Sequence, residues 1–325
     1  MGKLTIASAI ITLLAMVLSG CSTSLTSADN DESTGAGSTG ETATIEVTRN
    51  FGRELILERD IPVEPGTTAL EALQSVATVE TQYGGGFVSS INGVGSENSG
   101  TGREKKDWFF HINGIAGNTG AGDYILRPGD SEHWDYREWG YHQFVPAVIG
   151  DFPQPFLSGY RGERRPTALV YEDAFAGEAE DVVTALKKSG VAEVTAYRID
   201  EFGDEDRENS NIIIIGLPSN ALIAEMNGLH RKLGFYAFFA RDELTVLDAA
   251  GEAAGIFGAG YGLIQATQNP WNPKGTGAGE NAAWMVTGTD ADGVRSAARV
   301  LSGHADKLCK AFAVIVYDDA VTKIP

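Results

Sequence analysis

The sequence is short of positive charge. Of its 325 residues, 25 are Lys or Arg and 44 are Asp or Glu, which gives a formal net charge of −19 at pH 7. A negative field of this size repels the phosphate backbone of nucleic acids and the surface of anionic lipids. We therefore expect no nucleic-acid partner.

Cysteine is equally scarce, because Cys21 and Cys309 are the only two in the chain. Two thiols cannot form a disulfide framework, so packing has to stabilise the fold. The apolar residues, 42% of the chain, are enough for a sizeable core, and the 40 glycines indicate many turns and loops. At about 150 residues per domain, the length predicts two folded units.

The spacings that mark common catalytic and metal sites are also missing. The histidines show no His-x-x-x-His or paired-cysteine pattern, and they stand at positions 111, 133, 142, 230 and 304. No Gly-x-Ser-x-Gly motif occurs, and the glycine-rich segment 255–262 is not followed by the Gly-Lys-Ser/Thr of a phosphate-binding loop. We expect a protein that is not an enzyme, with no catalytic residues and no assigned metal ligands, and the acidic segment Asp200–Glu208 leaves Ca²⁺ binding open as an alternative.

The N-terminus is typical of an export signal. Lys3 precedes an apolar stretch, Leu4–Leu18, which is too short for a comfortable membrane span. The following Leu18-Ser19-Gly20-Cys21 resembles a bacterial lipobox, which implies a lipoprotein signal over 1–21, a lipid anchor on Cys21 and a place on the extracytoplasmic face of the cell membrane. An ordinary secretory signal is the alternative. Residues 22–43 are rich in Ser, Thr, Gly and acidic side chains and predict a disordered tether.

Residues 44–143 predict a small sheet crossed by one helix. Ile45 and Val47 alternate with polar residues, as in a strand with one buried face, and the run around 51–57 completes a hairpin. Thr68 and Glu71 have the spacing of a capping box at the start of a helix. Three further strands follow, and the order β-β-α-β-β-β fits an α+β domain of the β-grasp type.

Three segments of this region carry a family resemblance. Asp107–Gly114, Tyr124–Asp130 and His133–Tyr136 resemble the aromatic strand and the two turns of the transcobalamin-like C-terminal domain. That family is the small β-domain of cobalamin carriers, so the resemblance implies a corrinoid as ligand. The carriers close a second domain of helical hairpins over the ligand, and no such hairpins are evident in this sequence.

Aromatic residues are dense between positions 108 and 144. One interpretation is a flat apolar wall for a large ring system, and the other is a sheet that packs on both faces. Neighbouring glycine-rich loops leave backbone groups open to a ligand. The residues expected to bind it are Tyr83, Gly85, Phe87, Asn92, Trp108, Phe110, Asn113, Gly114, Asn118, His133 and Trp134.

The rest of the chain predicts a linker and a second unit. Residues 144–166 are rich in proline and glycine but too apolar for a free tether, so we expect a packed linker. Residues 167–325 alternate strands and helices, which indicates an α/β domain with a largely parallel sheet. Its segments Gln268–Pro273 and Val286–Asp290 resemble an α/β module of envelope and S-layer-type proteins. That resemblance implies the competing function, a non-catalytic structural or adhesion protein with an envelope protein or glycan as partner.

Overall fold

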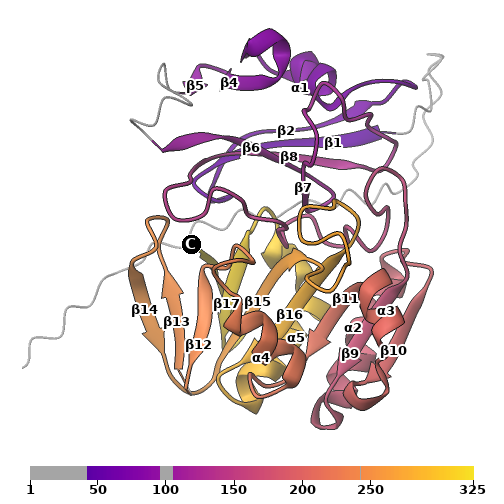
Figure 1. Ribbon diagram of the computed structural model, residues 1–325, viewed down its shortest axis with the longest axis vertical. Helices are drawn as coiled ribbons and strands as arrows, with labels where there is room; N and C mark the ends of the chain where they lie inside the picture. Colours follow the sequence, from indigo (N-terminus) through magenta and orange to yellow (C-terminus); the bar gives the residue numbers. More distant parts are fainter. Residues whose placement is uncertain (1–41, 96–104, 242) are drawn as a thin grey trace, which may run out of the picture.

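The computed structural model describes residues 42–95, 105–241 and 243–325 (Figure 1). The chain is a mixed α and β protein with several sheets and few helices. The expected signal, Cys21 and most of the expected tether lie outside the described residues. The tether's last two residues, 42 and 43, already belong to the first strand. Within the described part, no helix is long and apolar enough to cross a membrane.

The N-terminal unit, residues 42–143, is built on a five-stranded sheet. Its order is β2-β1-β8-β6-β7, and β1 and β8 are parallel neighbours while the other pairs are antiparallel. The strands are β1 (Thr42–Arg49), β2 (Glu54–Pro62), β6 (Lys106–Ile112), β7 (Ile115–Ala116) and β8 (Ser131–Glu138).

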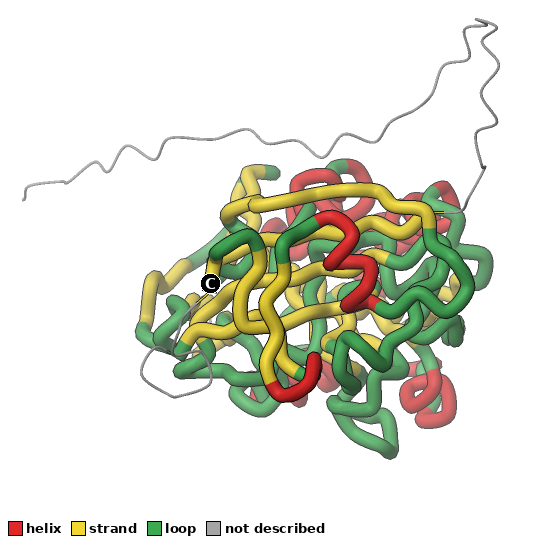
Figure 2. Tube along the Cα trace, turned by 90° about the horizontal axis from the view of Figure 1, so that it is seen from above, coloured by secondary structure: helices red, strands yellow, loops and turns green. Residues whose placement is uncertain are grey.

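One face of this sheet is covered by helix α1 (Ala69–Val76), which lies above the strands in Figure 1. The predicted capping box is confirmed, since Thr68 Oγ1 accepts from the Glu71 N–H and Glu71 Oε2 accepts from the Thr68 N–H. A small antiparallel sheet joins the helix; its strands are β3 (Val79–Gln82), β4 (Phe87–Ile91) and β5 (Val94–Gly95). Figure 2 shows these layers from above.

The C-terminal unit, residues 167–325, has a seven-stranded sheet of order β10-β9-β11-β16-β15-β17-β18. The first four are parallel, and β15, β17 and β18 are antiparallel to their neighbours. The expectation of a largely parallel sheet is therefore correct for one half only. Two connections turn back instead of crossing over: β15 leads into its antiparallel neighbour β16, and a tight turn at Asp318 and Asp319, both with positive φ, joins β17 to β18 as a hairpin. The bounds are β9 (Thr167–Tyr171), β10 (Val194–Arg198), β11 (Asn211–Ile215), β15 (Tyr261–Gln268), β16 (Ala282–Gly288), β17 (Ala313–Tyr317) and β18 (Ala320–Ile324).

Helices lie on both faces of this sheet. Strand β11 is buried throughout, as its four isoleucines predict. Ile213 and Ile215 share a core with α2 (Ala176–Lys188) and α5 (Ala291–Gly303), whereas Ile212 and Ile214 share one with α4 (Ala221–Gly228). The short helix α3 (Asp204–Asn209) precedes β11.

A three-stranded antiparallel sheet also belongs to the second unit. It consists of β12 (Ala237–Ala240), β13 (Glu243–Leu247) and β14 (Ala253–Phe257), of which β13 was not expected. The glycine-rich segment 255–262 does not form a hairpin between neighbouring strands, because β14 and β15 belong to different sheets. The segment instead connects the three-stranded sheet to the seven-stranded sheet.

The second face of the five-stranded sheet packs on the C-terminal unit. Phe51 of the N-terminal unit and Phe312 of the C-terminal unit share an apolar cluster with Val145 and Val148 of the segment 144–166. That segment is well buried, and its Phe156 belongs to the core under α2 and α5. The sheet is therefore enclosed between α1 and the second unit.

Candidate functional site

The expected binding residues do not share one surface. Tyr83 is 86% exposed, and Asn92 and Asn118 are also exposed, while Gly85, Phe87 and Phe110 are half-buried. Asn92 Oδ1 accepts from the Thr78 N–H, and Asn118 Nδ2 donates to the Ala278 C=O. Part of the expected binding set is therefore accessible, but the side-chain amides of Asn92 and Asn118 already have partners within the chain.

The two tryptophans of this set are core residues. Trp108 and Trp134 are only 5% and 3% exposed and belong to the apolar cluster beneath α1. Phe110 stacks on Trp134 with ring centroids 4.9 Å apart. The Trp108 indole N–H donates to the Val94 C=O, and that of Trp134 donates to the Glu132 carboxylate. On this face of the sheet, packing accounts for the aromatic density.

Asn113 and Gly114 hold a turn rather than line a surface. Asn113 Nδ2 donates to Asp130 Oδ1 and to the Gly159 C=O, and both distances are 2.7 Å. Gly114 has φ +73°, and its N–H donates to Asp151 Oδ2 at 2.7 Å. A Cβ at Gly114 would stand 2.9 Å from the Val148 carbonyl oxygen, so only glycine fits. Through its bonds to Asp151 and Gly159 the turn holds the segment 144–166, which joins the units.

His133 lies on the opposite face of β8 from Trp134, because successive side chains of a strand alternate. It is completely buried and faces the C-terminal unit, where Phe312 lies edge-on to its ring. The same face carries a layer of buried polar side chains: Glu46, Thr48, His111, His133, Asp135 and Arg137.

A cleft of about 530 Å³ opens at the edge of this interface. Its apolar lining includes Phe51 from the β1–β2 turn, Leu247 and Phe257 from the small sheet, and Ile324 near the C-terminus. The marked C-terminal end in Figure 1 lies at this junction. The volume is within the range of small-molecule sites, and such sites often lie where two domains meet.

Charges of both signs surround the cleft. The ionisable side chains among its lining residues are Arg53, Glu54, Lys106, Glu138, Asp248 and Lys323. Lys323 Nζ donates to the Gly52 C=O at 2.8 Å, which links the C-terminal strand to the β1–β2 turn. Burial, and secondarily the charge of Lys310, lowers the pKa of Lys323 to about 8. The lining can therefore both donate and accept hydrogen bonds beside its apolar side chains.

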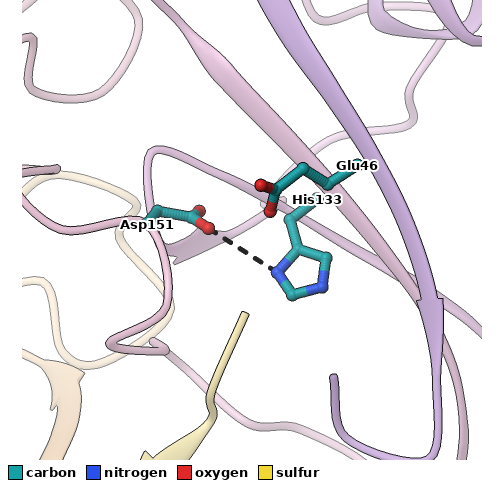
Figure 3. A group of neighbouring side chains, drawn as sticks. All are labelled: Glu46, His133 and Asp151. Atoms are coloured by element: carbon teal, nitrogen blue, oxygen red, sulfur yellow. Dashed lines mark ion pairs between the residues drawn. The ribbon is translucent and has the colours of Figure 1, made fainter. Parts of the chain in front are cut away.

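A second feature lies deeper in the interface. Glu46 of β1, His133 of β8 and Asp151 of the joining segment are all buried and point toward one another (Figure 3). His133 Nδ1 and Asp151 Oδ1 are 3.6 Å apart. One potential ligand atom from each residue lies within 4.8 Å of the other two.

The charges of this cluster depend on one another. Burial raises the pKa of Glu46, and the neighbouring His133 and Lys310 offset only part of that effect. Burial by itself lowers the pKa of His133, but the carboxylates of Asp151 and Glu46 reverse the direction and raise it overall. The arrangement favours a positive charge at the centre of the three residues.

Sequence reasoning missed both features. The cleft is lined by segments around positions 50, 138, 250 and 323, and the cluster joins positions 46, 133 and 151. Neither set has a local spacing that marks a site, since the residues meet only when the two units pack together. His133 is the one member of the cluster that the sequence analysis expected in a binding site, whereas Glu46 and Asp151 carry no local signal.

Comparison with known proteins finds a family match within the N-terminal unit. Residues 66–138 match the model of a domain of unknown function, DUF4430, which covers less than a quarter of the chain. The matched segment lies inside the region that resembles the transcobalamin-like domain. No curated protein matches the chain.

Two solved structures align with about a third of the chain. Haptocorrin in complex with Cbi is 18% identical with a TM-score of 0.26, and the alignment covers 30% of this chain and 25% of haptocorrin. A Ruminococcus gnavus protein described as a "putative metal binding protein" is 19% identical with a TM-score of 0.24, and the alignment covers 30% of this chain and 97% of that one. The chain thus spans about a quarter of haptocorrin, and scores this low do not decide a fold or a ligand.

Proposed function

We propose that the protein is a binding protein that takes a small-molecule ligand in the cleft between its two units. The observation that carries this proposal is the cleft itself, whose lining combines apolar side chains with hydrogen-bond donors and acceptors. We propose no catalytic role for the cleft.

The ligand class that we propose is a corrinoid. A corrinoid is a broad disc fringed with amides, whose N–H groups can donate to Glu138 or Asp248 and whose carbonyls can accept from Lys106. The phenyl ring of Phe257 can pack against the flat face of such a disc. The arrangement of α1 over a sheet with parallel β1 and β8 supports interpreting the N-terminal unit as a β-grasp domain of the transcobalamin-like type.

The proposed location follows from the sequence alone. On that basis we propose a lipid anchor on Cys21, which would hold the binding unit on the extracytoplasmic face of the cell membrane. There it can capture a ligand for a membrane partner.

The test is a titration of the purified protein with dicyanocobinamide and cyanocobalamin, followed by calorimetry and by the visible spectrum. We expect saturable heat and a spectral shift. Phe257→Ala, in the cleft, should weaken binding about tenfold or more. Tyr83→Ala is the matched control, since it removes an exposed aromatic ring from the other candidate surface and should leave the affinity unchanged.

The variants also distinguish the alternatives. A loss of affinity with Tyr83→Ala but not with Phe257→Ala would show that the ligand binds near Tyr83 and the other exposed residues of the expected binding set. No heat and no spectral change with either corrinoid at high micromolar concentration would contradict a corrinoid ligand. If a tagged copy then retained one envelope protein or glycan stoichiometrically, the structural role would replace the proposed one.

A further inference from the structure

The buried cluster of Glu46, His133 and Asp151 has a pattern that ordinary ion pairing does not explain. In each side chain one polar atom contacts another polar group of the protein, and the other polar atom has no hydrogen-bond partner within the described part of the chain. We call these held and unheld atoms, respectively. The unheld atoms are Glu46 Oε2, His133 Nδ1 and Asp151 Oδ1, and none has a hydrogen-bond partner among the described residues. Buried polar groups without partners cost free energy, so three that converge on one point need an occupant.

The held atoms are fixed from three directions. Asp151 Oδ2 accepts from the Gly114 N–H at 2.7 Å, and Glu46 Oε1 lies 3.4 Å from Lys310 Nζ. His133 Nε2 lies 2.7 Å from Thr48 Oγ1. These contacts hold all three side chains in place, with one potential ligand atom of each within 4.8 Å of the other two.

Hydrogen bonding also assigns the proton on the outer nitrogen of His133. Thr48 Oγ1 donates to Asp135 Oδ2 at 2.7 Å, and this carboxylate also accepts from the N–H groups of Phe51 and Gly52. Having used its only proton, the Thr48 hydroxyl must accept from Nε2–H of His133. Nδ1 therefore presents its lone pair, or a second proton, to two carboxylates. A histidine ligand whose far nitrogen is held through a hydroxyl and a carboxylate is a common support for a bound metal.

The spacing is better suited to a metal ion than to a proton. The 3.6 Å between His133 Nδ1 and Asp151 Oδ1 is too long for a good hydrogen bond. Two ligands of a tetrahedral zinc ion, each with a bond of about 2.1 Å, lie about 3.4 Å apart. We propose that Glu46, His133 and Asp151 bind one divalent transition-metal ion of the zinc class, which ties the joining segment to the sheet of the N-terminal unit. The imidazole ligand favours zinc over calcium.

The experiment measures metal alone, so it does not depend on the corrinoid proposal. The purified protein is unfolded in guanidinium with EDTA, refolded with Zn²⁺, Ca²⁺ or EDTA, and freed of unbound metal. We expect one zinc per chain and no retained calcium. At a zinc concentration about 100-fold above Kd, the Tm should be about 5–10 °C higher than in EDTA.

Two neighbouring carboxylates provide a matched pair of variants. Glu46 and Glu58 both contact Lys310 Nζ, at 3.4 Å and 3.0 Å, but only Glu46 has an atom at the centre of the cluster. Glu46→Gln should lose the zinc and the rise in Tm, whereas Glu58→Gln should keep both. Asp151→Asn, which can still accept from the Gly114 N–H, should weaken zinc binding about tenfold or more.

Co²⁺ in place of Zn²⁺ gives a second readout, because its visible band reports nitrogen and oxygen ligation directly. The band should be present in Glu58→Gln and absent in Glu46→Gln. Folded protein that retains no zinc, or equal retention by the two glutamine variants, would overturn the proposal and assign the cluster to a buried ion pair with a protonated His133. Either result leaves the cobinamide titration to be judged by itself.

Discussion

Among single residues, Trp134 tests whether the aromatic layer beneath α1 belongs to the core. Its side chain is 3% exposed and stacks on Phe110. Trp134→Ala should therefore lower the free energy of unfolding by ~3–5 kcal/mol in urea unfolding. Tyr83→Ala, at a side chain that is 86% exposed, should change it by less than about 0.5 kcal/mol. A stable Trp134→Ala variant that loses only ligand affinity would return Trp134 to the binding surface.

Trp134 and its neighbour His133 show which features of the fold can be predicted from the sequence and which cannot. Alternation along a strand implies that Trp134 and His133 lie on opposite faces, although both were expected in one binding set, and it does not say that both faces are covered. Coverage of the second face comes from Phe312, which follows His133 by nearly 180 positions. The cluster around His133 was missed for the same reason, since its three members come from separate segments.

At the scale of elements, close packing of α5 on the sheet depends on glycine. A Cβ on Gly288 of β16 would stand 2.5 Å from Gly293 C of α5, so Gly288→Ala must separate the helix from the strand. We expect a loss of about 1–3 kcal/mol in the free energy of unfolding. The matched control is Gly277→Ala, in a loop where an added Cβ meets no atom within 4 Å. Equal Tm values for the two variants would contradict this account of the packing.

Elements with a strong local signal were predicted well. The capping box of α1 and the doubly buried β11 follow from a few neighbouring residues. Strand β13 was missed, and so was the antiparallel half of the large sheet. Strand direction depends on whether a connection turns back at once or crosses over, and the Asp318-Asp319 turn carries no glycine to mark it.

For the whole molecule, Lys323 reports on how the two units meet. Burial, together with the nearby Lys310, lowers the pKa of Lys323 to about 8 from an ordinary 10.5. Below pH 8 the lysine is charged in both the folded and the unfolded chain. Between pH 8 and 10.5 the folded chain has released the proton and the unfolded chain still holds it, so this group makes stability rise with pH.

Lys323→Met removes that dependence. Urea unfolding of both proteins from pH 7.5 to 10.5 should show a larger gain, or a smaller loss, for the native chain than for the variant over this window. Parallel curves would mean that Lys323 is not desolvated at the junction, which would contradict the packing of the C-terminal strand against the β1–β2 turn.

The central claim is that a ligand binds between the two units, and amide hydrogen exchange with and without dicyanocobinamide tests it most directly. The account predicts slower exchange in three separate segments that line the cleft: residues 50–54, 246–257 and 322–325. Residues 83–95, which include four residues of the expected binding set, should exchange at the same rate in both samples. Protection confined to residues 83–95, with no change in the three cleft segments, would contradict the claim.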